Sequence, residues 1–105
     1  MIVFGDLPFD FRVYRQALAL SDAGNRISLI ATDFGSRSLP EAWSQFNLQL
    51  IPIDRCRSLR RSYPYFWRLA AQRAVDLAAD VYHAHDLDAL WPAARAARRR
   101  DVPLI

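Results

Sequence analysis

Two histidines and two aspartates crowd the end of one apolar segment of this chain: His83, His85, Asp86 and Asp88. Imidazole nitrogens bind metals or transfer protons near neutral pH, and carboxylates act as general acids and bases. Because side chains alternate along a strand, His83 and His85 are expected to point to the same face. The cluster is therefore compatible with a metal site, an acid–base site, the wall of a binding cleft, or a polar turn from a strand into a helix.

The metal alternative lacks further ligands. The chain has no third histidine, its single cysteine is Cys56, and the spacing does not match the histidine-rich pattern of binuclear hydrolases. A zinc site normally has three or four protein ligands. We therefore predict no metal site and favour His83, His85 and Asp86 as cleft-lining residues, with Asp88 as the N-cap of the following helix. A His-x-His metal-dependent hydrolase is the weaker alternative.

A second polar cluster follows the first apolar run, at Gly5, Asp6, Asp10 and Arg12. Asp10 directly precedes an amphipathic segment, so it is predicted to be a helix N-cap. Arg12 would then lie in the first turn of that helix. Its guanidinium is expected either to reach an anionic acceptor or to be a solvated surface charge.

The elements that must position these clusters follow from the apolar periodicity. Short β-type runs and longer amphipathic segments alternate, and residues 7–9 are predicted to be a loop, because the residue before Pro8 is driven out of the helical region. The predicted strands are residues 2–4, 27–31, 48–53, 81–84 and 102–105, and the predicted helices are residues 11–23, about 39–46 with Ser38 as the cap, 62–79 and 88–100. Parallel strands need such crossover connections, and helices then cover both faces of the sheet.

The predicted fold class is therefore α/β: a Rossmann-like three-layer αβα unit with a mainly parallel sheet of about five strands, incomplete at the C-terminus. Residues 1–105 are expected to form a single domain, since 105 residues with 52% hydrophobic content suit one core. The cluster of His83, His85, Asp86 and Asp88 lies at the carboxyl end of a predicted strand, and open parallel sheets bind ligands outside the carboxyl ends of their strands.

The charge, the cysteine content and the lengths of the apolar runs indicate which partners and which cellular location to expect. The formal charge is +3, and all 14 cationic side chains are arginine, which suits anionic partners but also fits a bias of genome composition. A lone cysteine excludes an intramolecular disulfide, and no apolar run approaches the roughly 18 residues of a membrane span. We therefore expect a cytoplasmic protein.

Arginines alternate with aromatic residues between Arg55 and Arg68. Such a surface can contact anionic lipid headgroups, bind nucleic acid, or simply be a solvated loop that leads into a buried helix. No nucleic-acid-binding motif accompanies the charge, so no nucleic-acid partner is expected. Two interpretations of this stretch remain. It is either a solvated loop or a surface that makes peripheral contact with the inner face of the membrane.

Two blocks of sequence resemble the amino-terminal domain of family 4 glycosyltransferases of the GT-B fold. The first comprises IVFGD at residues 2–6, DFRVYRQALALSDAG at residues 10–24 and the apolar run at 27–31. The second comprises ADVYHAHDLDAL at residues 79–90, Pro-Ala-Ala at 92–94 and VPLI at 102–105. The resemblance covers nearly the whole chain.

This resemblance implies transfer of a sugar from a nucleotide-diphosphate donor to an acceptor hydroxyl, in a cleft between two Rossmann domains. The amino-terminal domain would hold an acceptor glycan or a lipid-linked acceptor. The implied cleft-lining residues are Gly5, Asp6, Asp10, Arg12, His83, His85 and Asp86. No catalytic residue is assigned. The nucleotide-sugar donor would bind a C-terminal Rossmann domain outside this fragment, so we expect no cofactor here and no activity from the chain alone. A noncatalytic Rossmann-like binding module is the alternative.

Overall fold

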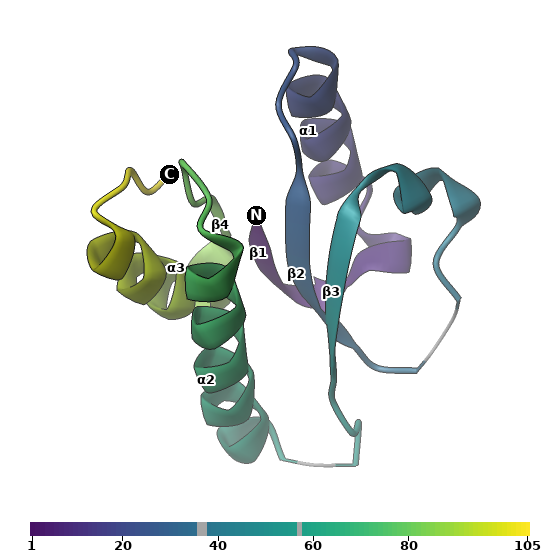
Figure 1. Ribbon diagram of the computed structural model, residues 1–105. Coiled ribbons are helices and arrows are strands. Elements are labelled where there is room, and N and C mark those ends of the chain that lie inside the picture. The colour runs from purple at the N-terminus through teal and green to yellow at the C-terminus, as the bar shows by residue number, and fades with distance from the viewer. Residues whose placement is uncertain (36–37, 57) are drawn as a thin grey trace.

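The computed structural model describes residues 1–35, 38–56 and 58–105. Strands and helices alternate along the chain, as predicted (Figure 1). The elements are β1 (Ile2–Asp6), the 3-10 helix η1 (Leu7–Phe9), α1 (Phe11–Asp22), β2 (Ser28–Asp33), the 3-10 helix η2 (Glu41–Gln45), β3 (Asn47–Pro52), α2 (Leu59–Leu77), β4 (Ala84–His85) and α3 (Asp86–Arg100). This element order confirms the α/β class.

The described strands form one parallel sheet in the order β3-β2-β1-β4. The chain moves outward from β1 to β2 and β3, and then crosses to the other side of β1 to form β4. The strand order therefore reverses between β1 and β4, and α/β sheets bind ligands at such a switch point. The switch point lies between β1, which contains Gly5 and Asp6, and β4, which ends at His85, so these predicted cleft-lining residues lie beside it.

The C-terminal segment was predicted as a fifth strand, and the sheet has four. Leu104 makes one parallel bridge with Tyr82, outside the named strands. The Ile105 amide donates to the Tyr82 carbonyl at 2.8 Å, and the Tyr82 amide donates to the Pro103 carbonyl at 3.0 Å. Pro103 has no N–H to extend this pairing. The segment therefore lies beside β4 without forming a full strand.

Two hydrophobic cores lie on opposite faces of the sheet. Ile2 packs in the core beneath α2 and α3, together with Phe66 and Ala93. Its neighbour Val3 packs in the other core, with Val13 of α1. Successive strand side chains point to opposite faces, so both residues can be buried only when both faces are covered. Figure 1 shows α2 and α3 on one side of the sheet and α1 on the other, which confirms the three-layer αβα unit.

Several element boundaries differ from the prediction. Residues 7–9 form the 3-10 helix η1 instead of a loop, because Pro8 lies in its first turn, where a missing N–H costs nothing. Strand β4 comprises Ala84 and His85 instead of residues 81–84, and Tyr82 forms an isolated bridge with Leu104 outside the named strands. None of the described helices is both long and apolar enough to cross a membrane.

Both long helices also begin earlier than predicted, and each therefore has its proline beyond the first turn. Helix α2 begins at Leu59 instead of residue 62, and α3 begins at Asp86 instead of residue 88. Pro64 and Pro92 consequently lie inside the helices. A proline in a helix interior removes one hydrogen bond and crowds the carbonyl four residues earlier. These helices must therefore be stabilised by contacts outside themselves.

In α3, one such contact satisfies the carbonyl group that faces the proline. Pro92 has no N–H for the carbonyl of Asp88, and the indole Nε1–H of Trp67 donates to that oxygen at 2.6 Å. The centroids of the Trp67 and Trp91 rings also lie 5.9 Å apart. A side chain of α2 thus replaces the missing hydrogen bond of α3.

Replacing Trp67 by phenylalanine is expected to lower the free energy of unfolding by about 1–3 kcal/mol, because a partly buried carbonyl loses its donor. In a Pro92→Ala background the alanine N–H can bond to Asp88, so the same substitution should cost less. Urea denaturation of the two single variants and the double variant measures this coupling. Equal costs in both backgrounds would contradict the compensating role of Trp67.

Candidate functional site

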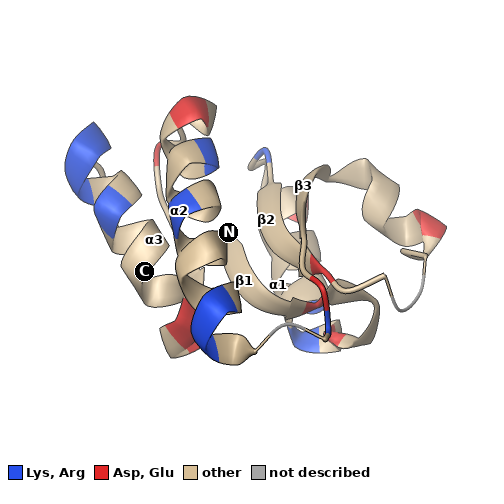
Figure 2. Cartoon of the chain, turned by 90° about the horizontal axis from the view of Figure 1, so that it is seen from below, with Lys and Arg blue, Asp and Glu red and all other residues tan. Residues whose placement is uncertain are grey.

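The two polar clusters meet at the carboxyl ends of β1 and β4, which are hydrogen-bonded neighbours. Gly5 and Asp6 end β1, and His85 ends β4. The first turns of α1 and α3 supply Arg12 and Asp86. Figure 2 views the chain from this end of the sheet and shows acidic and basic segments close together there. The fold therefore brings together residues that are far apart in the sequence.

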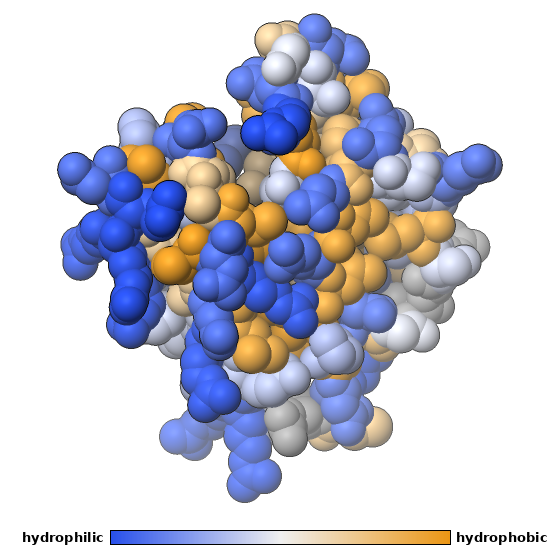
Figure 3. Space-filling view, viewed as in Figure 1, coloured by the Kyte–Doolittle hydropathy of each residue, from blue (hydrophilic) through white to orange (hydrophobic). Residues whose placement is uncertain are grey.

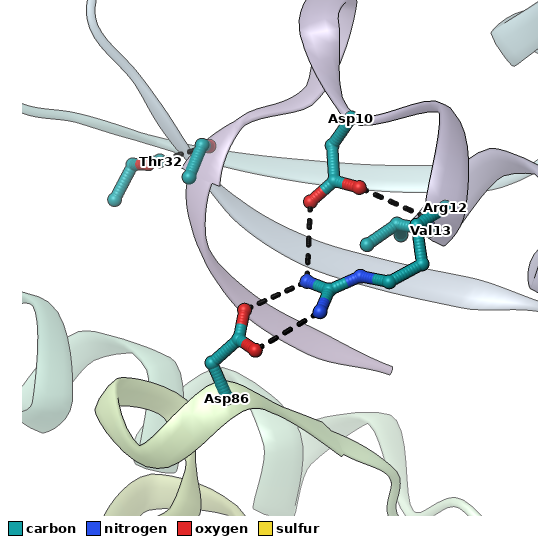
Figure 4. Close-up of polar contacts among 6 residues, drawn as sticks. Asp10, Arg12, Val13, Thr32 and Asp86 are labelled. Carbon is teal, nitrogen blue, oxygen red and sulfur yellow. Dashed lines mark hydrogen bonds and ion pairs between the residues drawn. The ribbon is translucent and has the colours of Figure 1, made fainter.

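Arg12 and Asp86 form a bidentate ion pair between α1 and α3 (Figure 4). Nη1 donates to Oδ1 at 3.0 Å, and Nη2 donates to Oδ2 at 2.7 Å. The hydrogen bonds from Arg12 lower the pKa of Asp86, and the hydrogen bonds to Asp86 raise the pKa of Arg12. Both side chains are half exposed, so the pair adds little stability. Its bidentate geometry instead fixes how the two helix starts face each other.

The backbone of Asp86 adopts a left-handed conformation, with φ at +66°. Aspartate tolerates this region better than most residues, but it is still uncommon outside glycine. The conformation turns the chain from β4 into α3 within one residue and presents the carboxylate to Arg12 (Figure 4). Unusual backbone conformations persist where the surroundings enforce them, and they cluster at functional sites.

The two histidine rings stack at the end of β4, with centroids 4.3 Å apart and an interplanar angle of 20°. The rings are thus side by side, as the alternation predicted. His85 is only 4% exposed, and among the described residues its Nε2 has no hydrogen-bond partner. Burial lowers the pKa of His85 to about 4, and burial also lowers the pKa of His83. Both rings are therefore neutral at pH 7, and Nε2 of His85 can donate or accept one hydrogen bond, depending on the tautomer.

Asp10 caps α1, as predicted, because its Oδ1 accepts a hydrogen bond from the amide of Val13 at 3.1 Å. Its other oxygen lies 3.6 Å from Nη2 of Arg12. Asp88 is not an N-cap: it is the third residue of α3, and His85 occupies the cap position without a side-chain cap bond. In the first turn, Asp88 still complements the positive end of the helix dipole.

Replacing Asp10 by alanine is expected to destabilise the chain by about 1 kcal/mol, because the Val13 amide loses its acceptor. Asparagine can accept the same bond, so Asp10→Asn should retain most of that stability. Thermal unfolding followed by circular dichroism compares the two variants. An asparagine variant as unstable as the alanine variant would show that the charge of Asp10, through Arg12, matters more than the cap.

The end of β1 is connected to its neighbours through main-chain and side-chain contacts. The carbonyl of Gly5 accepts a hydrogen bond from Thr32 Oγ1 at 2.7 Å, across to β2 (Figure 4). Oδ2 of Asp6 accepts one from Nη2 of Arg55 at 2.9 Å. The Arg55 guanidinium carbon also lies 5.5 Å from the centroid of the Phe34 ring. Arg55, which the sequence placed in an arginine-rich surface, thus belongs to this edge of the sheet.

A hollow that the sequence analysis missed lies along the same edge, beyond β2 and β3. Its volume is about 580 Å³, and it is lined by Asp33, Phe34, Gly35, Pro52, Ile53, Asp54 and Tyr65. The signal in the sequence was an aspartate at or just after the end of each strand. Asp33 Oδ1 accepts from the Gly35 amide and Asp54 Oδ1 accepts from the Cys56 amide, each at 2.8 Å, so both carboxylates also organise the loops.

The described residues contain no group of three or more His, Cys, Asp or Glu side chains placed to hold a metal ion. The stacked pair of histidines has Asp86 as a sequence neighbour, but that carboxylate bonds to Arg12. Nothing in the geometry therefore favours the metal-dependent hydrolase. The arrangement favours hydrogen bonding to a polar ligand.

Comparison with known proteins assigns the family. No curated protein and no solved structure matches the chain significantly. The family model for Glycosyltransferase Family 4 matches residues 11–105, which include the α-helices α1, α2 and α3 and the strands β2, β3 and β4. The matched region carries Arg12, His85 and Asp86, and it agrees with the resemblance found in the sequence. The chain therefore belongs to glycosyltransferase family 4, and it represents amino-terminal domain sequence of that family.

Proposed function

We propose that this chain is the acceptor-side portion of a glycosyltransferase that moves a sugar from a nucleotide-diphosphate donor to an acceptor hydroxyl. The family match supports sugar-transfer chemistry. The convergence of Arg12, His85 and Asp86 at the switch point of the sheet supports this edge as the acceptor site. The proposed cleft-lining residues are Gly5, Asp6, Asp10, Arg12, His83, His85 and Asp86.

The charges at this edge favour a hydroxyl-bearing ligand over an anion. The guanidinium of Arg12 already faces the carboxylates of Asp86 and Asp10, so an anion would have to compete with both. A hydroxyl group can donate to a carboxylate and accept from a guanidinium at once. The two histidines are neutral at pH 7, so they add no positive charge that would attract an anion to this edge. These features suit an uncharged sugar or alcohol.

The donor is proposed to bind a second Rossmann domain, which would stabilise the leaving diphosphate electrostatically. The residues at this edge would then bind and orient the acceptor. Under this proposal the 105-residue chain needs no cofactor of its own and does not transfer sugar by itself. A noncatalytic binding module would differ in one respect, because it would bind a nucleotide at this edge without any second domain.

Titrations followed by NMR test the proposal on the chain itself. Neutral mono- and disaccharides are expected to shift the imidazole C–H signals of His83 and His85, and a nucleotide-diphosphate sugar should leave those two signals unchanged. Arg12→Ala should weaken the saccharide shifts, whereas Arg15→Ala, an exposed arginine of the same helix, should not. Histidine shifts caused by the nucleotide sugar alone would contradict the acceptor role and favour the binding module.

A lipid-linked acceptor would bring the chain to a membrane surface, and part of the arginine-rich stretch suits that contact. Leu59 is 60% exposed, and Arg60 and Arg61 beside it are exposed. Other parts of the stretch do not contribute, since Phe66 is buried in the core and Arg55 pairs with Asp6. Arg57 lies outside the described residues. We propose the start of α2 as the contact with the inner face of the membrane.

Flotation with vesicles tests this contact. The chain should float with phosphatidylglycerol vesicles and not with phosphatidylcholine vesicles, because each arginine near an anionic surface contributes about 1 kcal/mol. The double variant Arg60→Gln/Arg61→Gln should then bind at least about tenfold more weakly. A matched double variant, Arg98→Gln/Arg100→Gln, changes the net charge equally. Equal losses in both would argue against a localised contact.

A further inference from the structure

We propose that the groove between α2 and α3 binds a small phosphate-bearing ligand. The groove has a volume of about 540 Å³ and is lined by Arg68, Ala71, Gln72, Val75, Asp76, Trp91, Arg95 and Arg99. This volume lies within the range of roughly 300–1,000 Å³ typical of small-molecule sites. None of these residues belongs to the acceptor edge, so the groove is independent of the proposed function.

Two matching rows of side chains form the walls of the groove. On α2 the row is Arg68, Gln72 and Asp76, and on α3 it is Trp91, Arg95 and Arg99. Residues four apart lie on the same face of a helix, so each row runs along one wall. Small and medium side chains, Ala71 and Val75, lie between the rows. The surface is concave because the long side chains of the two rows project beyond the shorter side chains between them.

The groove has an excess of positive charge. Three guanidinium groups and one carboxylate line it, and among the described residues none of these three arginines forms an ion pair. Arg12 and Arg55, by contrast, are paired with aspartates. Figure 3 shows strongly hydrophilic side chains over both helices on this face. Unpaired guanidinium groups around a concave surface attract an anion, because the local field is not cancelled.

The kind of anion follows from the geometry of arginine. Guanidinium groups bind phosphate oxygens through two parallel hydrogen bonds, and three arginines can surround one or two phosphate groups. The Arg95 guanidinium carbon lies 5.5 Å from the centroid of the Trp91 ring, so cation–π contact restrains the guanidinium before a ligand binds. Asp76 opposes contact with a uniformly anionic surface, which favours a discrete ligand over a membrane.

Binding of inorganic pyrophosphate, followed by NMR, tests the groove directly. The Nε–Hε signals of Arg68, Arg95 and Arg99 and the indole N–H signal of Trp91 are expected to shift saturably. Arg95→Gln should raise the dissociation constant about tenfold, because one charge-assisted contact is lost. Arg98→Gln is the matched control: it removes the same charge from the same helix at a position that does not line the groove. Its dissociation constant should equal that of the unmodified chain.

Two results would overturn the proposal. Shifts that do not saturate, or that weaken equally in the Arg95 and Arg98 variants, would mean that pyrophosphate only samples a diffuse basic surface. Phosphatidylglycerol vesicles that bind through Arg95 and Arg99, with no shift from pyrophosphate, would instead make this face a membrane contact. The His83 and His85 signals report on the acceptor edge in the same spectra, so failure of the groove and failure of the proposed function are distinguishable.

Discussion

Replacing Phe66 by alanine is expected to lower the free energy of unfolding by about 3–5 kcal/mol, the largest effect we predict for a single side chain. Phe66 is fully buried on the inner face of α2. Its ring packs edge-to-face on Phe4 of β1, with centroids 5.1 Å apart. The substitution removes most of that buried apolar surface and leaves a cavity that α2 and the sheet cannot close. Small domains are stable by only about 5–15 kcal/mol, so this variant should be close to unfolding.

Urea denaturation followed by tryptophan fluorescence measures the effect of Phe66→Ala. The matched control is Phe11→Ala, which makes the same chemical change at a side chain that is 75% exposed. Its free energy of unfolding should change by no more than about 0.5 kcal/mol. A loss below 1 kcal/mol in the Phe66 variant would be incompatible with a core centred between α2 and the sheet.

Lowering the pH from 7 to 4 is expected to remove about 1–3 kcal/mol of stability through His85 alone. Burial lowers the pKa of this imidazole to about 4 in the folded chain, whereas the unfolded chain has the ordinary value of 6.5. Between these two values the unfolded state binds more protons than the folded state. The contribution of His85 is therefore fully present above pH 6.5 and is lost progressively as the pH falls toward 4.

The variant His85→Gln separates this contribution from other titrations. Glutamine does not ionise, so the variant should lose less stability than the unmodified chain between pH 6.5 and 4. His83 has a pKa shifted in the same direction, so His83→Gln measures its share. The buried amino group of Met1, with a pKa lowered to about 6, titrates mainly between pH 8 and 6. Identical pH profiles for the His85 variant and the unmodified chain would contradict a buried neutral imidazole.

The sequence was sufficient for the features that depend on near neighbours. Alternating apolar runs and amphipathic segments determined the α/β class and the three-layer arrangement, because burial of a strand or of a helix face follows a fixed period. The N-cap role of Asp10 was equally visible, since a cap acts on amides only two or three residues away. Family motifs identified the glycosyltransferase family that the family model confirms.

Local rules failed where distant residues compensated for an unfavourable local feature. Helix α3 was predicted to start at residue 88, which would place Pro92 in its first turn; the sequence does not show that Trp67 donates to the Asp88 carbonyl, which Pro92 leaves without an N–H in the longer helix. Asp88 resembled an N-cap, yet the left-handed conformation of Asp86 starts the helix two residues earlier. In both cases the preference of the local sequence for a particular helix start is weak, so the tertiary context overrides it.

The partners of charged side chains were decided by tertiary structure alone. Arg12 and Asp86 are 74 residues apart, and only the placement of α1 and α3 at neighbouring strand ends makes them a pair. Arg55 and Asp6 are also distant in sequence and form a pair, whereas Arg95 and Arg99 line an open groove. The type of each residue fixes its charge, but the fold fixes which charges are neutralised, because pairing requires close approach in space and not along the chain. For this protein, the sequence determined the family and the edge of the sheet that carries the candidate site, and the tertiary structure decided which groups at that edge and in the groove have no partner within the described chain.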